Sequence, residues 1–347
     1  MAGSLRLAYL TTAYPEVSHT FIRREILELE RRGHHVLRLS IRRPTSNLVD
    51  PLDLAEEQRT LHLLDDLLGL VGSVVGMAFG RPLRTWRAMQ MAFRMSSRSD
   101  RGFLRHLAYV GEAARIVRIL EARSIDHLHV HFGTNASAVA RLAHVLGGPS
   151  WSMTIHGPNE FDQPIAFSLG DKVADAAFTV AISHFCAAQI RRWAAWEHWR
   201  RIAIVHCTID DAFEGSFEAI PSNSKRFVCV GRLAPAKGHA VLIEAFAEVV
   251  REDPEARLLL AGDGELRPFL EREIERLGLG AHVEILGWVG SEQVRELLRS
   301  SRAFVLPSFA EGLPVVMMAA FAAGRPVVTG HVGAIPDLVE PGRSGWL

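Results

Sequence analysis

Two cations stand in one short loop of the sequence, immediately before an apparent helix. Arg232 and Lys237 lie in the segment VGRLAPAKGH, after an apolar run that is typical of a strand. Free backbone N–H groups and the positive end of the helix dipole favour an anion at such a place. Arg offers a planar fork and Lys a point charge, so the pair can flank a diphosphate. The alternative is two solvated loop cations.

A single carboxylate, Glu311, opens the segment SFAEGLPVV after another apolar run. A carboxylate in a strand-to-helix loop can accept hydrogen bonds from sugar hydroxyls. Gly312 lets the backbone approach a ligand, and Pro314 suits a first helical turn. The alternative is an acid that merely stabilises the helix N-terminus.

Histidines end two further strands. His156 precedes the turn formed by Gly157 and Pro158 in MTIHGPNEFD, which leaves the imidazole at a strand edge. The alternative, and the more usual case, is a structural histidine whose hydrogen bonds are satisfied. The segment HLHVHFG carries three alternating histidines, which invites a metal hypothesis: His127, His129 and His131. No nearby carboxylate completes a ligand set, and alternation is ordinary in a half-buried strand, so we expect no metal site.

Several motifs are absent from the sequence. There is no Asp-x-Asp pair to hold a divalent ion on a nucleotide diphosphate, no G-x-x-x-x-G-K-[ST] loop and no G-x-S-x-G. If a diphosphate leaves here, side chains and a helix end must stabilise it.

Strands and helices alternate along both halves of the chain, which predicts an α/β protein with parallel, doubly wound sheets. One helix should begin at Thr20 as its N-cap and end at Gly33. A polar, turn-rich stretch separates the halves. We predict an N-terminal Rossmann-like domain at 1–213, a linker at 214–223 and a second Rossmann-like domain at 224–347. Ligands of such sheets bind outside the carboxyl ends of the strands, here in a cleft between the domains.

The composition limits the possible partners and compartments. The 347 residues are 48% hydrophobic and 22% charged, with a formal net charge of zero, which gives no electrostatic reason to expect nucleic acid. Three widely spaced cysteines argue for a reducing compartment. The N-terminus does not look like a signal peptide, and the apolar run at 67–79 is too short to cross a bilayer. We predict a cytoplasmic protein.

Residues 67–105 form an unusual apolar and basic segment. After the apolar run at 67–79 come seven arginines and one acid, Asp100, interleaved with large apolar side chains. The arginines are Arg81, Arg84, Arg87, Arg94, Arg98, Arg101 and Arg105. This composition is typical of an amphipathic surface for anionic lipid, which would place the protein peripherally at the inner face of the plasma membrane. The alternative is a packed helix with a solvated basic face.

Taken together, these segments resemble a known family. VGRL…KG, AGDGELRPFLE, SRAFVLPSFAEGLPVV and GRPVVTGHVGAIPDLVEPGRSGWL resemble the retaining GT4-type glycosyltransferases, in their bacterial exopolysaccharide or colanic acid branch. YPEVSHTFIRREILELERRGHHV, HVHFGTNAS and SMTIHGPNEFD agree, so the resemblance covers nearly the whole chain. It implies a GT-B fold, with an N-terminal acceptor domain and a C-terminal nucleotide-sugar domain, and metal-independent transfer with retention at the anomeric carbon.

The resemblance also implies roles for individual residues. Arg232 and Lys237 would hold the donor diphosphate and stabilise the departing nucleotide, while His156 and Glu311 would lie beside the donor sugar. These four are the candidate catalytic residues. The implied donor-binding residues are Gly231, Arg232, Lys237, Gly262, Glu311, Gly312, Leu313 and Pro314. No cofactor is implied beyond the donor substrate, a UDP- or GDP-linked sugar.

The chain departs from the family pattern at position 319. The second glutamate of the family's E-x7-E motif, which grips the ribose, is replaced by Ala319. Losing a charged acceptor for two ribose hydroxyls is expected to cost about 1.5–3 kcal/mol of binding, roughly ten- to a hundredfold. Relatives also continue beyond the GRSGWL segment, so we expect a truncated, incomplete C-terminal domain.

Three functions follow from these residues. The leading one is transfer of a sugar from a nucleoside diphosphate sugar to a glycan or lipid-linked glycan acceptor. A second is a nucleotide-sugar epimerase on the same fold. A third is a catalytically impaired scaffold that binds nucleotide or glycan, which Ala319 would favour. Product formation distinguishes the first from the third, and isomerisation without acceptor identifies the second.

Overall fold

The computed structural model describes residues 3–209, 213 and 219–347 of the protein, which divide into two compact units. Unit 1 comprises residues 1–46 and 52–206, and unit 2 comprises residues 47–51 and 207–347. The division falls between His206 and Cys207, a few residues before the boundary predicted from sequence. Part of the predicted linker, residues 214–218, lies outside the described residues.

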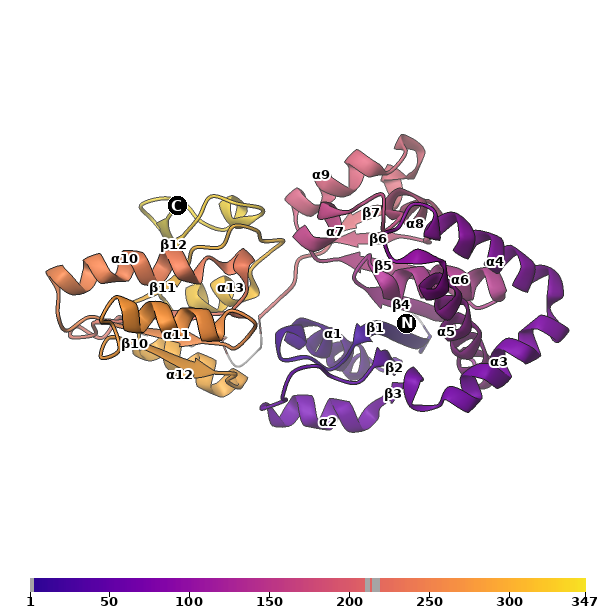
Figure 1. Ribbon diagram of the computed structural model, residues 1–347, viewed down its shortest axis with the longest axis horizontal. Helices are drawn as coiled ribbons and strands as arrows, with labels where there is room; N and C mark the ends of the chain where they lie inside the picture. The colour runs from indigo at the N-terminus through magenta and orange to yellow at the C-terminus, as the bar shows by residue number, and fades with distance from the viewer. Residues whose placement is uncertain (1–2, 210–212, 214–218) are drawn as a thin grey trace. The chain divides into compact units, whose positions relative to one another are not determined.

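Unit 1 is built on a seven-stranded sheet of order β3-β2-β1-β4-β5-β6-β7, with every pair of neighbours parallel (Figure 1). Its strands are β1 Arg6–Ala13, β2 His35–Arg42, β3 Thr60–His62, β4 His127–His131, β5 Ser150–Ile155, β6 Thr179–Ala181 and β7 Ile202–Ile204. Its helices are α1 Thr20–Arg31, α2 Pro51–Arg59, α3 Leu67–Gly80, α4 Pro82–Ser96, α5 Gly102–Ala122, α6 Asn135–Leu146, α7 Pro158–Asp162, α8 Leu169–Asp175 and α9 His184–Trp193.

Unit 2 is built on a six-stranded parallel sheet of order β10-β9-β8-β11-β12-β13. Its strands are β8 Arg226–Val230, β9 Arg257–Ala261, β10 Val283–Gly287, β11 Ala303–Leu306, β12 Val327–Thr329 and β13 Gly345–Trp346. Its helices are α10 His239–Glu252, α11 Arg267–Arg276, α12 Ser291–Ser300 and α13 Val315–Ala322. The predicted pair of doubly wound domains is therefore confirmed.

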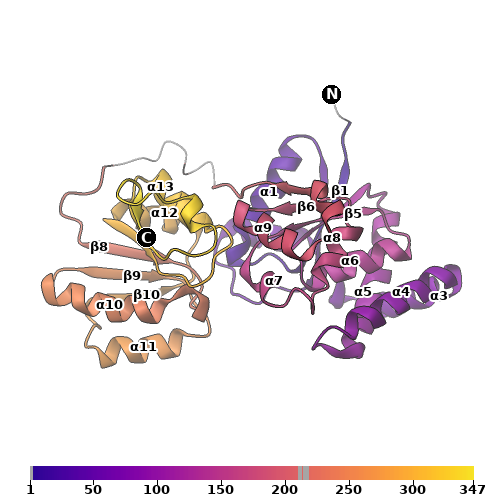
Figure 2. The same ribbon diagram turned by 90° about the horizontal axis from the view of Figure 1, so that it is seen from above.

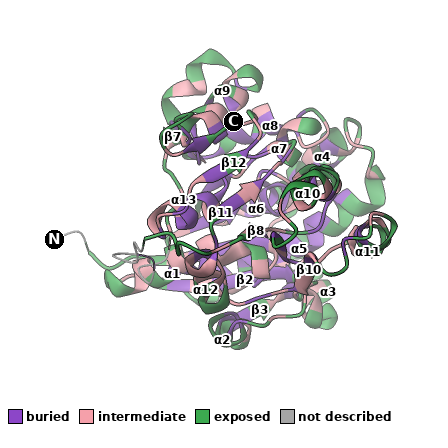
Figure 3. Cartoon of the chain, turned by 90° about the vertical axis from the view of Figure 1, so that its left-hand side faces the viewer, coloured by how far each residue is buried: buried purple, intermediate pink, exposed green. Residues whose placement is uncertain are grey.

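Both sheets follow from apolar strands that bury both faces, as parallel sheets do (Figure 3). The helices are amphipathic: α10 buries His239, Leu242, Ile243 and Phe246, at the spacing of one helix face. Helix α1 begins at Thr20 with His19 as its N-cap, so the N-cap was predicted one residue too late in the sequence. The chain leaves that helix at Gly33, whose φ of +89° suits glycine.

Among the described residues, every helix is either too short or too polar to span a membrane.

Candidate functional site

The predicted donor-site cations lie at the carboxyl edge of β8 in unit 2. After β8, the chain makes a short 3-10 turn over Pro235–Lys237 and enters α10 through Gly238. Lys237 therefore stands directly before the first turn of a 14-residue helix. Arg232 is exposed and makes no ion pair with any residue that the structure describes. An exposed arginine beside a helix N-terminus is a suitable place for an anion.

Glu311 lies at the carboxyl edge of β11, the sheet neighbour of β8. Its Oε1 accepts hydrogen bonds from Lys237 Nζ at 2.5 Å and from Ser308 Oγ at 2.6 Å. Glu311 is buried and the Lys237 side chain is 26% exposed, so the ion pair is shielded from water on its carboxylate side. Oε2 accepts no hydrogen bond from the described part of the chain, which leaves one carboxylate oxygen for a ligand.

This geometry decides between the alternatives that the sequence left open for Lys237 and Glu311. The alternative of two solvated cations is wrong for Lys237, because it is paired with Glu311. The alternative of a helix N-terminal acid is wrong for Glu311, because α13 begins only at Val315 and has no acid in its first turn. Pro314 is the N-cap of α13 rather than its first helical residue. The residues between them, Gly312 and Leu313, are buried.

The predicted donor-binding glycines bring two loops into close contact. A Cβ on Gly262 would lie 1.9 Å from the carbonyl oxygen of Gly231, and its φ is +156°. Gly231 N–H donates to Ala261 O and Leu233 N–H to Asp263 O, which joins the loops after β8 and β9. Gly262 is thus required by backbone packing, whatever else it contacts.

Position 319 lies inside the unit. Ala319 is 5% exposed and belongs to the hydrophobic core cluster of unit 2, with Met317 and Ala320 beside it on α13. A longer, charged side chain at this position must therefore either leave the core or remain unsolvated.

His156 belongs to unit 1, at the carboxyl edge of β5. Its Nε2 lies 2.8 Å from Nδ1 of His131, which ends the neighbouring strand β4. The rings of Phe21 and Phe132 pack against it at 4.5 and 4.8 Å between centroids. Burial, followed by the nearby histidines, holds the pKa of His156 well below its usual value. The imidazole is therefore neutral at pH 7 and makes its hydrogen bond as a fixed tautomer.

Sequence reasoning missed a carboxylate that supports this edge of unit 1, Glu160 on α7. Its two oxygens accept hydrogen bonds from the backbone N–H groups of Gly133, His156 and Gly157. The side chain is 3% exposed, and burial raises its pKa to about 7. Glu160 thereby ties the loop after β4 to the loop that carries His156. The acid three residues after Gly157, a capping-box spacing, was the available signal.

Lys172 completes this support from α8. Its Nζ donates to the carbonyl oxygens of Gly133 and Thr134 at 2.8 and 2.6 Å. The side chain is 1% exposed, and burial lowers its pKa to about 7. The Gly133 peptide region is thus held from both sides, by Glu160 through N–H and by Lys172 through the carbonyl.

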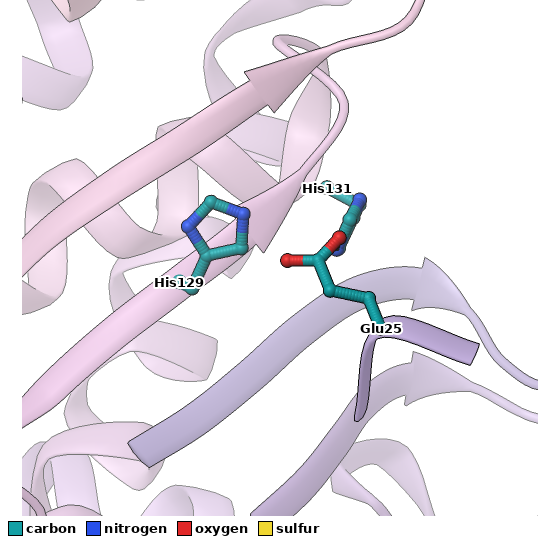
Figure 4. A group of neighbouring side chains, drawn as sticks. All are labelled: Glu25, His129 and His131. Atoms are coloured by element: carbon teal, nitrogen blue, oxygen red, sulfur yellow. The ribbon is translucent and has the colours of Figure 1, made fainter. Parts of the chain in front are cut away.

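The reason given for dismissing a metal at the alternating histidines is wrong, because a carboxylate does lie beside them. Glu25 of α1 lies against His129 and His131, with candidate ligand atoms within 4.8 Å of one another (Figure 4). Both ring nitrogens of His129 lie within hydrogen-bond distance of hydroxyls, at 2.8 Å from Ser152 Oγ and 2.9 Å from Thr154 Oγ1. Glu25 in turn accepts from Tyr9. Strand β4 is also buried almost throughout, not half-buried. The absence of a metal site stays a prediction.

The four candidate catalytic residues thus fall into two groups. Lys237 and Glu311 touch each other, and Arg232 lies in the same loop as Lys237, all in unit 2. His156 stands in unit 1 with His131.

Comparisons with known proteins lead to glycosyltransferases. Residues 212–347 match the family described as "Glycosyl transferases group 1". The chain is 35% identical over 133 residues to the putative colanic acid biosynthesis glycosyltransferase WcaL of Salmonella typhimurium, covering 37% of this chain and 33% of that protein. It is 25% identical over 243 residues to the putative teichuronic acid biosynthesis glycosyltransferase TuaC of Bacillus subtilis, covering 65% of this chain and 59% of that protein.

Solved structures match over a longer span. The structure of Anabaena HepE in complex with UDP and glucose covers 99% of this chain and 85% of its own, with a TM-score of 0.71 at 18% identity. This likeness confirms the predicted GT-B fold. The predicted resemblance to group 1 glycosyltransferases is confirmed as well. The chain spans about a third of the length of the first curated relatives it matches.

Proposed function

We propose that this protein is a glycosyltransferase that moves a sugar from a nucleoside diphosphate sugar to a glycan or lipid-linked glycan acceptor. One observation carries the proposal. Lys237 and Glu311 are paired where the adjacent strands β8 and β11 end, with exposed Arg232 in the same loop, inside the segment that matches group 1 glycosyltransferases. A cation for phosphate and a carboxylate for sugar hydroxyls are the two contacts that such a donor requires.

Arg232 is assigned to the donor diphosphate because it is exposed and has no ion pair among the described residues. Lys237 contributes a second charge at the N-terminus of α10, and Glu311 holds that ammonium in place through Oε1. The free Oε2 of Glu311 then accepts a hydroxyl of the donor sugar. One carboxylate thereby links the phosphate-binding cation to the sugar.

The reaction has a simple balance. The bond from the anomeric carbon to the diphosphate oxygen breaks, and its electron pair stays with the phosphate. An acceptor hydroxyl oxygen bonds to the anomeric carbon as its proton passes to the departing diphosphate oxygen. Arg232 and Lys237 stabilise the charge on the leaving nucleotide. We propose that His156 lies beside the donor sugar, where its neutral imidazole acts as a hydrogen-bond partner.

We further propose retention at the anomeric carbon and no requirement for a divalent metal. The resemblance supports the first. The second is supported by the missing Asp-x-Asp pair and by two cations placed where a metal would otherwise neutralise the diphosphate.

The names of the relatives favour surface or exopolysaccharide synthesis as the process. We propose the cytoplasmic face of the membrane as its place. The UDP complex of the Anabaena protein favours UDP over GDP as the donor nucleotide.

Calorimetric titration tests the donor site. UDP and GDP are titrated into the protein, into Arg232→Ala and into Arg272→Ala, which removes an exposed arginine of α11 as a matched control. We expect one nucleotide to bind, Arg232→Ala to weaken it at least tenfold, about 1.4 kcal/mol, and Arg272→Ala to leave it unchanged. Equal affinity for all three proteins would exclude Arg232 from the diphosphate site.

Product analysis tests the reaction. Incubation with UDP-sugar and a lipid-linked glycan extract, with and without EDTA, should release UDP and give an extended glycan of retained anomeric configuration. Nucleotide binding without any turnover would favour the scaffold, which Ala319 supports. Isomerised nucleotide sugar without acceptor would identify an epimerase.

A further inference from the structure

Helix α3 exposes an apolar face to solvent. It has no charged residue along Leu67–Gly80, and it buries Ser73 and Met77. Its exposed side chains recur at helical spacing, so they share one face of the helix: Leu68 (89% exposed), Val71 (58%), Val75 (50%) and Phe79 (85%). A 14-residue surface helix without charge is unusual in a water-soluble protein, because nothing polar on it faces the water.

Helix α4 continues this face and adds charge. It buries Ala88, Ala92 and Met95 against its unit. At about 100° per residue, the opposite face combines apolar and basic side chains: Leu83, Trp86, Arg87, Phe93 and Arg94. Leu83, Trp86 and Phe93 are 75%, 63% and 61% exposed. Basic and aromatic residues interleaved on one exposed face are typical of helices that lie in a lipid interface.

The start of α5 joins the same surface. Phe103 packs edge-on against Phe93, with 5.9 Å between ring centroids. Leu104, Leu107 and Arg105 are exposed beside it. Helices α3, α4 and α5 lie together at one edge of unit 1 (Figure 2). We name these exposed residues the α3–α5 patch: Leu67, Leu68, Val71, Val75, Phe79, Leu83, Arg84, Trp86, Arg87, Phe93, Arg94, Phe103, Leu104, Arg105 and Leu107.

The charges of the patch are not neutralised within the described residues. Arg81 is paired with Glu121, Arg98 with Asp171, and Arg101 is bonded to Asn135. The exposed arginines that remain form no ion pair with a described residue: Arg84, Arg87, Arg94 and Arg105. Among the described acids in this part of the chain, Asp100 is exposed, Asp66 is paired with Arg115, and Glu112, which interacts with Arg105, is buried. The patch therefore carries a net positive charge next to its apolar side chains.

We infer that the α3–α5 patch binds the surface of an anionic phospholipid bilayer, with α3 and α4 lying in the interface. This inference deepens the proposed function by naming the partner that would hold the enzyme beside a lipid-linked acceptor, and its observations are separate from the donor site. Charge decides against a second copy of the chain. A two-fold contact would bring the patch against itself, placing the unpaired arginines face to face without acids. Anionic headgroups supply the missing negative charge, and acyl chains cover the apolar residues.

Vesicle flotation tests the inference. The full chain is mixed with vesicles of phosphatidylcholine alone, or with 30% phosphatidylglycerol, at low and high salt. We expect flotation only with phosphatidylglycerol, weakened at high salt because screening acts on the arginines. We expect Arg87→Gln with Arg94→Gln to reduce the partition coefficient at least tenfold, and Phe79→Asp with Leu68→Asp to abolish flotation. Val241→Asp with Arg272→Gln, exposed residues of unit 2, should float like the unaltered protein.

Each possible result bears on the inference. All variants alter exposed side chains, and circular dichroism checks that they are folded. No flotation of the folded protein on anionic vesicles at low salt overturns the inference, as does equal flotation of patch and control variants. Sedimentation is run without vesicles. A dimer that Phe79→Asp converts to monomer would show that a second copy covers the patch, and would also overturn it. If UDP and GDP do not bind in the calorimetric titration, the expected flotation results stay the same. The proposed donor site and the proposed membrane surface can therefore be refuted independently.

Discussion

The contact between Lys237 and Glu311 shows what residue-level reasoning from sequence can and cannot reach. The residue types and their places after strands were predictable, since strand-to-helix loops of parallel sheets carry ligand-binding side chains. Their pairing was not, because it depends on β8 and β11 being neighbours although β9 and β10 intervene in sequence. The same holds for Glu25, which reaches His131 only because β1 and β4 are adjacent.

Position 319 gives a prediction at this scale. In Ala319→Glu the new carboxylate enters the core cluster of unit 2, so we expect a lower Tm in the free protein. If the position faces the ribose, UDP should recover that loss and bind roughly ten- to a hundredfold more tightly than to the unaltered protein. Thermal shift and calorimetry with UDP measure both effects.

Two controls sharpen this experiment. Ala319→Leu changes volume without charge, and 2′-deoxy-UDP removes one ribose hydroxyl. A gain that survives with 2′-deoxy-UDP, or that Ala319→Leu reproduces, would show that the carboxylate does not hold the ribose.

The buried histidines of unit 1 predict how its stability changes with pH. Burial lowers the pKa of His129 and His131 to about 3 and of His19 to about 4, and that of His156 well below its usual value. These imidazoles stay neutral in the folded chain but take up protons in the unfolded chain below about pH 6.5. Each one therefore removes stability as pH falls, by up to about 1.4 kcal/mol per pH unit.

Two buried carboxyls oppose this effect. Burial raises the pKa of Glu112 and Glu160 to about 7, so the folded chain takes up protons there first and gains stability as pH falls. Four imidazoles outweigh two carboxyls, and the free energy of unfolding should decrease between pH 6.5 and pH 5. Urea unfolding at several pH values measures this, and His131→Asn should flatten the slope. A protein that is more stable at pH 5 than at pH 7 would contradict the prediction.

At the scale of elements, the alternation of apolar runs with amphipathic segments predicted the parallel, doubly wound sheets of both halves. Boundaries were less certain, as Thr20 and Pro314 illustrate, because helix ends depend on local backbone angles. The support given by α7 and α8 was not predicted. Those helices are only five and seven residues long, too short for a periodic pattern, yet they carry Glu160 and Lys172.

Gly238, which leads into α10, gives a prediction about the donor loop. Its φ is +69°, and a Cβ there would lie 2.1 Å from the carbonyl oxygen of Pro307. Gly278 has the same φ of +69°, but a Cβ there would meet no atom within 4 Å. We expect Gly278→Ala to cost about 1–2 kcal/mol of unfolding free energy, and Gly238→Ala clearly more.

The two variants should also differ in ligand binding. Gly238 directly follows Lys237, so its displacement should weaken UDP binding at least tenfold, while Gly278→Ala leaves affinity intact. Chemical denaturation and calorimetry give both numbers. Equal costs for the two substitutions would mean that the Pro307 backbone moves aside easily.

For the whole molecule, two domains were predictable because each half repeats the alternation of strand and helix, and each sheet begins at an inner strand. The limits of the two units could not be predicted, because residues 47–51 group with unit 2 although they precede most of unit 1 in sequence. Their grouping reflects tertiary contacts that no local pattern carries.

Because the chain forms two compact units, we expect two thermal unfolding transitions. A donor nucleotide should raise the transition temperature of only one of them. UDP at a hundred times its Kd should stabilise unit 2 by about 2.7 kcal/mol and leave unit 1 unchanged. Scanning calorimetry with and without UDP tests this, and Arg232→Ala should remove the shift. A single transition that moves as a whole would contradict the prediction.

The strand order of unit 1 has a consequence for synthesis on the ribosome. Strand β1, an inner strand of the sheet, can pair with β2 early, but its other edge must wait for β4, after residues 14–126 have been made. During that interval an apolar strand edge remains open to other nascent chains. In unit 2 the central strand β8 waits only until β11 at Ala303–Leu306. A chaperone that shields exposed strands should therefore be needed chiefly while the N-terminal half emerges.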